Sequence, residues 1–504
     1  MKTKILSILV LTAFFSTSCT DLDEKLYDKV TTDDYGKTAA EIQTIVGGAY
    51  ATLRGFNDSD KGGTISFPTC EYVFFLEECA SDEATIPTRG TDWYDGGRYQ
   101  QIQYHTWNAN NIMILSAWKY CYQGIANVNS IIYQVDKSNL TDDDKAIVKA
   151  ELRGIRAYYY YQLLDQFGSV PIVTSFEESE LPAKSSRADV FKFVEDELKD
   201  ILDKLPSTIR YGGFTQNVAN SLLARLYLNA EVYTGTPRWQ DCINASEKVT
   251  GYILESDYFT SFKTKNETSR EIIFAIPYDH KEGTVGNYLA SMTFHYNQRF
   301  AFSTTGAYPW CGNGISAQPG LYSSFDENDV RRGSLLIGEQ KNLATGATVM
   351  MDNGNPLIYT EDFTKYTNAL QNEGARLFKY QIQADDQWER DNDWVLIRYA
   401  EILMMKAEAN FRLGFAASAL IYVNEIRNRA GLPSLTTLTL ESLDTEWKHE
   451  FVFEGLRRTT NIRFGTFFQP WWEKGVTPAF RGVYPIPQTV LDLNPNLKQN
   501  PDYN

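Results

Sequence analysis

The chain has 504 residues, of which 43% are hydrophobic and 22% are charged, a composition typical of a globular protein that buries a large core. Its 64 acidic and 48 basic side chains give a net charge of −16, which repels phosphate backbones and argues against nucleic acid as a partner. The four histidines lie far apart in the sequence, so a histidine-rich metal site is not expected.

The first 18 residues have the plan of a secretory signal. Lys2 and Lys4 precede an apolar run over residues 5–15, and small residues follow the run. This run is shorter than the about 20 apolar residues that a membrane-spanning helix needs. We therefore predict that residues 1–18 direct export and are then removed.

Cys19 stands directly after these small residues. A cysteine in this place is typical of a bacterial lipoprotein signal, in which the thiol is acylated and becomes the first residue. Ser16 stands where that motif more usually has leucine. We predict lipid attachment at Cys19 and a polar, acidic tether over residues 19–34; the alternative is an ordinary signal with an incidental cysteine.

About four pairs of amphipathic helices are predicted after the tether. Apolar or small side chains recur with helical spacing, and glycine or proline separates the best-defined partners. Thr141, followed by three aspartates, is the expected start of one helix, because the acids suit its positive dipole end. Pairs of about 34 residues have the period of tetratricopeptide repeats, so we expect a mainly α fold. The predicted pairs are 39–54 with 107–135, 141–167 with 188–205, 218–233 with 239–253, and 396–411 with 419–426.

Two long regions lack this helical period and are rich in glycine and aromatic residues. Their strands should be short, and loops of such length in a compact domain usually carry function. We therefore predict one domain over residues 35–504, in which helices form a scaffold and the two irregular regions bear the ligand. The scaffold is predicted at 35–55, 107–260 and 394–465, and the loop-rich regions at 56–106 and 283–393.

Five cysteines remain after Cys19, and none of them belongs to a C-x-x-C pair. A domain of this size has enough core to fold without disulfides, so most of these side chains should be buried thiols. A bridge between Cys70 and Cys79 is left open.

Several motifs, taken together, resemble the SusD/RagB family. The most extensive is the helix and turn over residues 152–171, and the others follow in the order that the family has. These further motifs lie at 221–230, 271–276, 396–403, 424–432, 450–458, 484–487 and 494–501.

The resemblance implies four tetratricopeptide-like helix pairs packed against a less regular half that bears the ligand. Members of this family are non-catalytic surface lipoproteins that bind oligosaccharides outside the outer membrane. They form a lid over a SusC-like, TonB-dependent barrel transporter. We accordingly expect a lipid-anchored glycan-binding protein on the exterior of the outer membrane, without enzymatic activity or cofactor.

A site for neutral sugars needs exposed aromatic faces with polar groups at their edges. The segment 89–97 offers Trp93 and Tyr94 as platforms, beside Arg89, Asp92 and Asp95. This segment coincides with the place where the family has part of its glycan site. The alternative is that the two rings only plug a loop onto the body of the domain.

Three aromatic residues of the second loop-rich region are further candidates for contact with sugar: Tyr288, Tyr296 and Trp310. Segments 352–355 and 385–393 carry oxygen ligands that calcium accepts. Neither has the complete twelve-residue calcium loop, so solvated loops are expected there.

Other functions stay open at this point. A surface glycoside hydrolase would need two carboxylates at a defined separation, and no local motif singles out such a pair. A tetratricopeptide scaffold could instead bind a peptide in its groove. Arg457, Arg458 and Arg463 are expected to pair with acids such as Glu450 and Glu454, with a phosphate site as the alternative.

Overall fold

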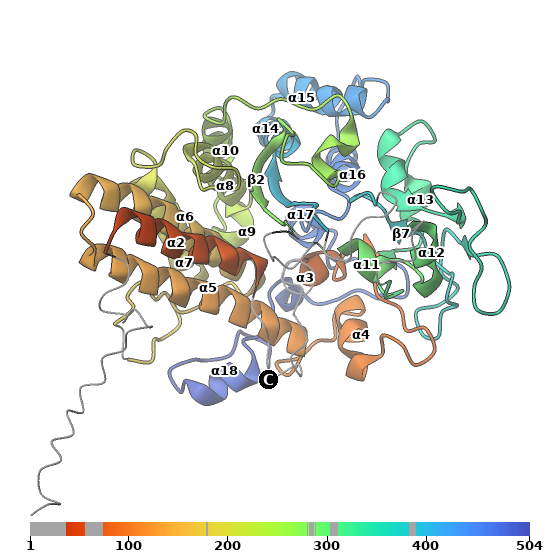
Figure 1. The fold of residues 1–504 in the computed structure, drawn as a ribbon, viewed down its shortest axis with the longest axis horizontal. Helices are drawn as coiled ribbons and strands as arrows, with labels where there is room; N and C mark the ends of the chain where they lie inside the picture. Colours follow the sequence, from red (N-terminus) through yellow and green to blue (C-terminus); the bar gives the residue numbers. More distant parts are fainter. Residues whose placement is uncertain are drawn as a thin grey trace, which may run out of the picture.

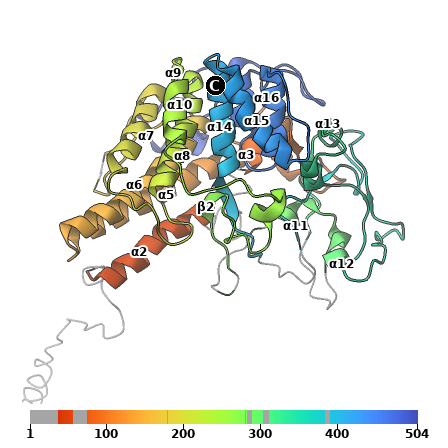
Figure 2. The same ribbon diagram turned by 90° about the horizontal axis from the view of Figure 1, so that it is seen from above.

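The computed structural model describes a mainly α protein in which helices gather on one side and loops with short strands on the other (Figures 1 and 2). The described residues are 37–55, 74–177, 180–279, 281, 287, 289–302, 311–382 and 390–503. The predicted signal, Cys19, the tether, Cys70, Tyr288 and Trp310 lie outside them. Among the described helices, none combines the length and apolar character that crossing a bilayer requires.

The helical side is a row of packed helix pairs. α2, α5, α6 and α7 lie side by side, α8 packs on α10, and α14 packs on both α10 and α15 (Figure 1). The predicted pairing of helices is thereby confirmed. The bounds are α2 Ala39–Ala51, α5 Ile112–Lys137, α6 Asp142–Gln166, α7 Arg187–Ile201, α8 Gln216–Leu228, α9 Ala230–Thr234, α10 Trp239–Ser246, α14 Tyr399–Arg412 and α15 Ala416–Arg429.

Local side chains cap the N-termini of several of the longer helices. The hydroxyl of Thr141 accepts the Asp144 N–H at 3.2 Å, so α6 begins at the predicted residue. α5 begins later than predicted, because Asn111 caps it through the Met113 N–H.

α10 ends earlier than predicted, at Ser246. The side-chain amide of Asn217 binds both the N–H and the carbonyl of Thr250 at 3.1 Å, which takes those backbone groups away from a continuing helix. The predicted helix over 218–233 is likewise divided at Asn229 into α8 and α9.

The irregular half holds short elements, as predicted. Most strands have two residues, and the longest antiparallel pair, β2 with β8, places Ile272 opposite Arg398 and Ile276 opposite Trp394. Three shorter antiparallel pairs are β1 Ala84–Thr85 with β3 Ser316–Ala317, β4 Leu335–Leu336 with β7 Arg376–Leu377, and β5 Gly338–Glu339 with β6 Ile358–Tyr359. The remaining elements are β2 Ile272–Ile276, β8 Trp394–Arg398, α3 Phe75–Glu78, α4 Arg98–Gln103, α11 Leu289–Thr293, α12 Arg299–Phe302, α13 Leu321–Ser324, α16 Leu440–Glu450, α17 Arg457–Phe464 and α18 Gln488–Leu493.

The described cysteines are all buried, as the sequence predicts: Cys79, Cys121, Cys242 and Cys311. Because Cys70 lies outside the described residues, its bridge with Cys79 stays a prediction.

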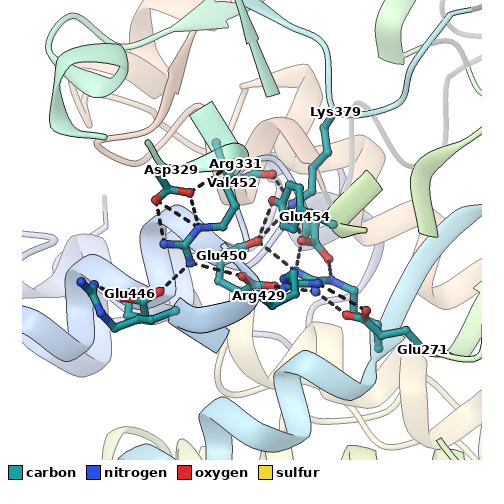
Figure 3. A network of polar contacts seen from close by, with 12 residues as sticks. Glu271, Asp329, Arg331, Lys379, Arg429, Glu446, Glu450, Val452 and Glu454 are labelled. Carbon is teal, nitrogen blue, oxygen red and sulfur yellow. Dashed lines mark hydrogen bonds and ion pairs between the residues drawn. The ribbon is translucent and has the colours of Figure 1, made fainter. Parts of the chain in front are cut away.

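Buried acids and bases join the two halves of the molecule (Figure 3). We call this set the buried charge network. It consists of Glu271, Asp329, Glu446, Glu450 and Glu454, with Arg331, Lys379, Arg398, Arg427 and Arg429.

Arg398, at the end of β8, is the most connected cation of the network. Its guanidinium donates to Glu271 and Glu450 at 2.7 Å and to Glu454 at 2.7 and 2.8 Å. Burial would raise the pKa of Glu450, but Arg429, Arg398 and Arg331 hold it well below its ordinary value. Glu450 therefore stays charged, and the network links α15 and α16 to loops of the irregular half.

We expect Glu450→Gln to lower the free energy of unfolding by about 3–5 kcal/mol, because three buried arginines lose a charged partner. Chemical denaturation of the purified protein measures this loss. The matched control is Lys192→Ala, which removes an ion pair with Asp196 whose side chains are 72% and 51% exposed. This control should change stability by less than about 1 kcal/mol; equal losses in both variants would contradict a central role for the network.

Alanine substitutions of glycines inside the helices test how closely the scaffold packs. A Cβ on Gly154 in α6 would lie 2.3 Å from the Phe214 ring, whereas a Cβ on Gly47 in α2 would meet nothing within 4 Å. We expect Gly154→Ala to lower the free energy of unfolding by about 1–3 kcal/mol. Gly47→Ala should raise it by about 0.5–1 kcal/mol, because alanine favours the helix. A neutral Gly154→Ala in the same denaturation series would show that α6 can shift away from Phe214.

Candidate functional site

The segment that carries most of the predicted site residues is a tight, irregular loop after β1. Arg89 and Asp92 exchange backbone hydrogen bonds of 3.1 and 3.2 Å around a turn in which Gly90 has a φ of 67°. Trp93 and Asp95 also have positive φ, at 61° and 42°, a conformation that costs free energy in residues other than glycine. Contacts with the rest of the protein must therefore hold this loop.

The buried side chain of Arg89 supports this loop through hydrogen bonds, so it is not available to a ligand. It is 1% exposed, and its guanidinium donates to the carbonyls of Asn313 at 3.0 Å and Glu373 at 2.9 Å, and to that of Leu370. Burial lowers its pKa, and the neighbouring Arg376 lowers it further. The expectation that Arg89 offers its charge to sugar hydroxyls is corrected: its donors are used to join the loop to residues 313–316 and 370–373.

The Trp93 side chain attaches the loop to the neighbouring residues 312–314. Its indole N–H donates to the Gly312 carbonyl at 2.7 Å, and its ring lies so close to Gly314 that a Cβ there would be 2.4 Å away. It also packs against Tyr99, with ring centroids 5.6 Å apart. The indole is partly buried. The position of Trp93 therefore fits a ring that packs the loop onto the body of the domain better than an exposed ring on which a sugar stacks.

The other residues of the loop face outward. Tyr94 is 57% exposed, and Asp92 and Asp95 are exposed as well. The Tyr296 hydroxyl, from the second loop-rich region, donates to the Asp92 carboxylate, and burial together with this carboxylate raises the Tyr296 pKa. Asp95 lies 3.8 Å from Arg98. The structure thus joins Asp92 to Tyr296 and leaves Tyr94 and Asp95 exposed on the same loop as Asp92.

Leu370 and Gln371, which follow β6, lie beside this loop; they belong to the predicted ligand-bearing region 283–393, although the sequence did not single them out. Leu370 is 64% exposed, and its carbonyl is held by Arg89. Gln371 is half-exposed and accepts a hydrogen bond from Asn313. The lack of a helical period marked the whole region 283–393 as ligand-bearing, but it could not single out these two residues. We call Asp92, Tyr94, Asp95, Tyr296, Leu370 and Gln371 the candidate surface.

The candidate surface combines an apolar ring, an apolar side chain and several carboxylate, amide and hydroxyl groups. Such a mixture suits a neutral, hydroxyl-rich ligand, whose C–H faces lie on rings while its hydroxyls form hydrogen bonds at the edges. Within the described residues, no cluster of three or more histidine, cysteine, aspartate or glutamate side chains is arranged to hold a metal ion.

The C-terminal arginines form structural ion pairs, but with other acids than expected. Arg457 binds Asp82 and Asp444 at 2.7 and 2.6 Å. Arg458 binds Asp165 at 2.7 Å, and Arg463 binds Glu408 at 2.8 Å. Glu450 and Glu454 belong instead to the buried charge network. Since the side chains of all three arginines are at most 4% exposed and already bound to carboxylates, they present no phosphate site at the surface.

Comparisons with known proteins agree with this architecture. Residues 233–479 match the model of the SusD family, and residues 76–228 match a second family model described as starch-binding and associating with the outer membrane. The starch-binding protein SusD of Bacteroides thetaiotaomicron is 27% identical over 463 residues, which cover 82% of each chain. SusD-like protein P2 of Formosa agariphila is 26% identical over 512 residues, covering 96% of this chain and 92% of that protein.

Solved structures show the same fold. The surface glycan-binding protein A of Bacteroides thetaiotaomicron, in complex with laminarihexaose, has a TM-score of 0.74 at 22% identity and covers 92% of this chain and 100% of that one. The two family models together span nearly all of residues 76–479, and the chain belongs to the SusD/RagB family.

Proposed function

We propose that this protein is a non-catalytic glycan-binding lipoprotein of the outer membrane, facing the exterior. The observation that carries the proposal is its family membership, with a relative named as a starch-binding protein over 82% of the chain. The candidate surface adds a mixed aromatic and polar face that suits an oligosaccharide. Neither a metal nor a cofactor is needed for such binding.

The proposal includes a place for the protein beside a transporter. It would capture oligosaccharides and act as the lid of a SusC-like, TonB-dependent barrel, held to the membrane by lipid on Cys19. The signal-like sequence before Cys19 supports the anchor, and the family resemblance supports the partner. The acidic tether would allow the lid to move while it stays attached.

Tyr94 gives the sharpest test of the candidate surface, because its ring is exposed and supports little else. We expect Tyr94→Ala to weaken glycan affinity about tenfold, as stacking on the sugar face is lost. Isothermal calorimetry against a panel that includes starch and laminarin oligosaccharides measures the change. Trp93→Ala should weaken binding too, but with a loss of stability, since Trp93 holds the loop.

Phe415→Ala is the matched control for Tyr94→Ala. Phe415 precedes α15, is 56% exposed, and belongs to the helical scaffold, not to the candidate surface. Its removal should leave affinity unchanged. If Tyr94→Ala binds as tightly as the unchanged protein, the glycan site lies elsewhere; if the folded protein binds no glycan of the panel, the proposed function itself fails.

Cys19 tests the anchor separately from binding. Cys19→Ala should leave glycan affinity intact and release the protein from the cell surface, because it removes the only residue to which the predicted lipid attaches. Fractionation of cells and protease accessibility report the location, and co-purification of a TonB-dependent barrel with the unchanged protein reports the partner. Retention of Cys19→Ala at the surface would contradict lipid anchoring at this position.

A further inference from the structure

Two buried glutamates clamp one turn of the chain. Glu78 ends α3 and Glu83 precedes β1, and they are 0% and 1% exposed. Glu78 Oε1 accepts the N–H groups of Gly455 and Leu456 at 2.5 and 3.2 Å, and Glu83 Oε1 accepts that of Phe453. Both carboxyls thus bind the turn over residues 451–456, which connects α16 with α17.

The second oxygen of each carboxyl has no such partner. Among the described residues, neither Glu78 Oε2 nor Glu83 Oε2 forms a hydrogen bond to a conventional donor, although both atoms are buried. Asp82, in the same segment, differs: it is paired with Arg457 at 2.7 Å and with Lys448 at 3.6 Å. A buried carboxyl oxygen without a donor is costly unless a proton bridges it to another acceptor.

The charges around this pair are already balanced by other groups. Arg457 is held by Asp82 and Asp444, Arg458 by Asp165 with Glu77 nearby, and Arg398 and Lys379 by Glu454. His105, whose pKa burial lowers, bonds to the Ala80 carbonyl through Nε2. Burial, followed by the charge of Glu83, raises the pKa of Glu78 well above its ordinary value, and burial raises that of Glu83 to about 7.

We propose that Glu78 and Glu83 share one proton between their Oε2 atoms, and that this proton is what allows both carboxyls to clamp the turn. With the proton in place, the pair carries one negative charge and one internal O–H···O hydrogen bond. When the proton is released to solvent, two buried carboxylates remain on one turn, and among the described residues neither Oε2 atom has a donor to stabilise its charge. Repulsion then opposes the clamp.

Loosening the clamp would affect two parts of the molecule. Phe453 has a φ of 61°, a conformation that a non-glycine residue adopts only under restraint. The carbonyls of Glu450 and Val452, at the start of the turn, hold Lys379 of the buried charge network. On the other side, Glu83 leads through β1 to Arg89 and the loop of the candidate surface.

The direction of the pH effect follows from the shared proton. In the unfolded chain both glutamates have ordinary pKa values, so they are deprotonated above about pH 5. The folded pair still binds a proton there, and stability therefore falls as pH rises through the folded value. The clamp is strongest in mildly acidic solution and weakest in alkaline solution.

Infrared spectroscopy of the purified full chain tests the shared proton directly. The C=O stretch of a protonated carboxyl should be present near pH 7 and disappear by about pH 10. In Glu83→Gln and in Glu78→Gln this band should lose the contribution of the pair, because an amide then supplies the bridging hydrogen. An unchanged band in both variants overturns the proposal.

Thermal unfolding and hydrogen exchange test the clamp itself. In the unchanged protein Tm should fall between about pH 6 and about pH 9, and roughly half of this fall should disappear in Glu83→Gln. Protection of the backbone amides of residues 451–456 against hydrogen exchange should fall at about pH 9. Glu77→Gln separates the contribution of Glu77, whose pKa burial raises to about 7, and Asp82→Asn should lower Tm at every pH without removing the fall.

If neither Glu83→Gln nor Glu78→Gln folds, the infrared titration is repeated in Glu77→Gln, which removes the other buried glutamate whose pKa is about 7, and absence of the band there overturns the shared proton. Any effect of pH on glycan affinity rests on the proposed function. If the band and the fall in Tm behave as expected while no glycan binds, the clamp stands and the proposed function fails.

Discussion

Buried ion pairs hold the irregular half of this protein together. Its strands are too short to do so through backbone hydrogen bonds. Most described strands have two residues and pair with one neighbour, so backbone ladders provide little order there. The buried charge network supplies what the strands lack. Arg398 alone joins β8 to Glu271, which precedes β2, and to Glu450 at the end of α16, and Arg331 joins the segment before β4 to α16 (Figure 3). Removing one partner leaves the others charged and buried, which makes these contacts cooperative.

Buried arginines also hold the loops beneath the candidate surface, in a smaller set than the buried charge network. Arg89 and Arg376 both donate to Ser316 Oγ, at 3.2 and 2.7 Å, and otherwise bind carbonyls of neighbouring loops. Burial lowers the pKa of Arg376 to about 10. Interior arginines with five donors can bind several loop carbonyls at once, which a short strand cannot do. The loops are therefore positioned by side chains from beneath rather than by a sheet.

Local signals predicted the scaffold well and the site only in part. The Thr141 cap and the apolar spacing of α14 and α15 are properties of neighbouring residues, and the structure agrees with both. The buried Arg89 donates a hydrogen bond to the carbonyl of Leu370, which lies 281 positions away in the sequence. No residue near Arg89 in the sequence indicates this contact. The partners of Arg457 and Arg458 were missed for the same reason. Long-range pairing decides which polar residues reach the surface.

The manner in which Arg89 holds its neighbours has a consequence for divergence. Three of its four contacts are to main-chain carbonyls, which every residue type provides. The side chains of Leu370 and of the exposed loop residues can therefore be exchanged without altering the path of the backbone beneath them. The outward side chains of this surface can therefore change through substitutions that leave the supporting backbone contacts intact. Under the proposed function, selection for a different polysaccharide would act on a few outward side chains and not on the fold.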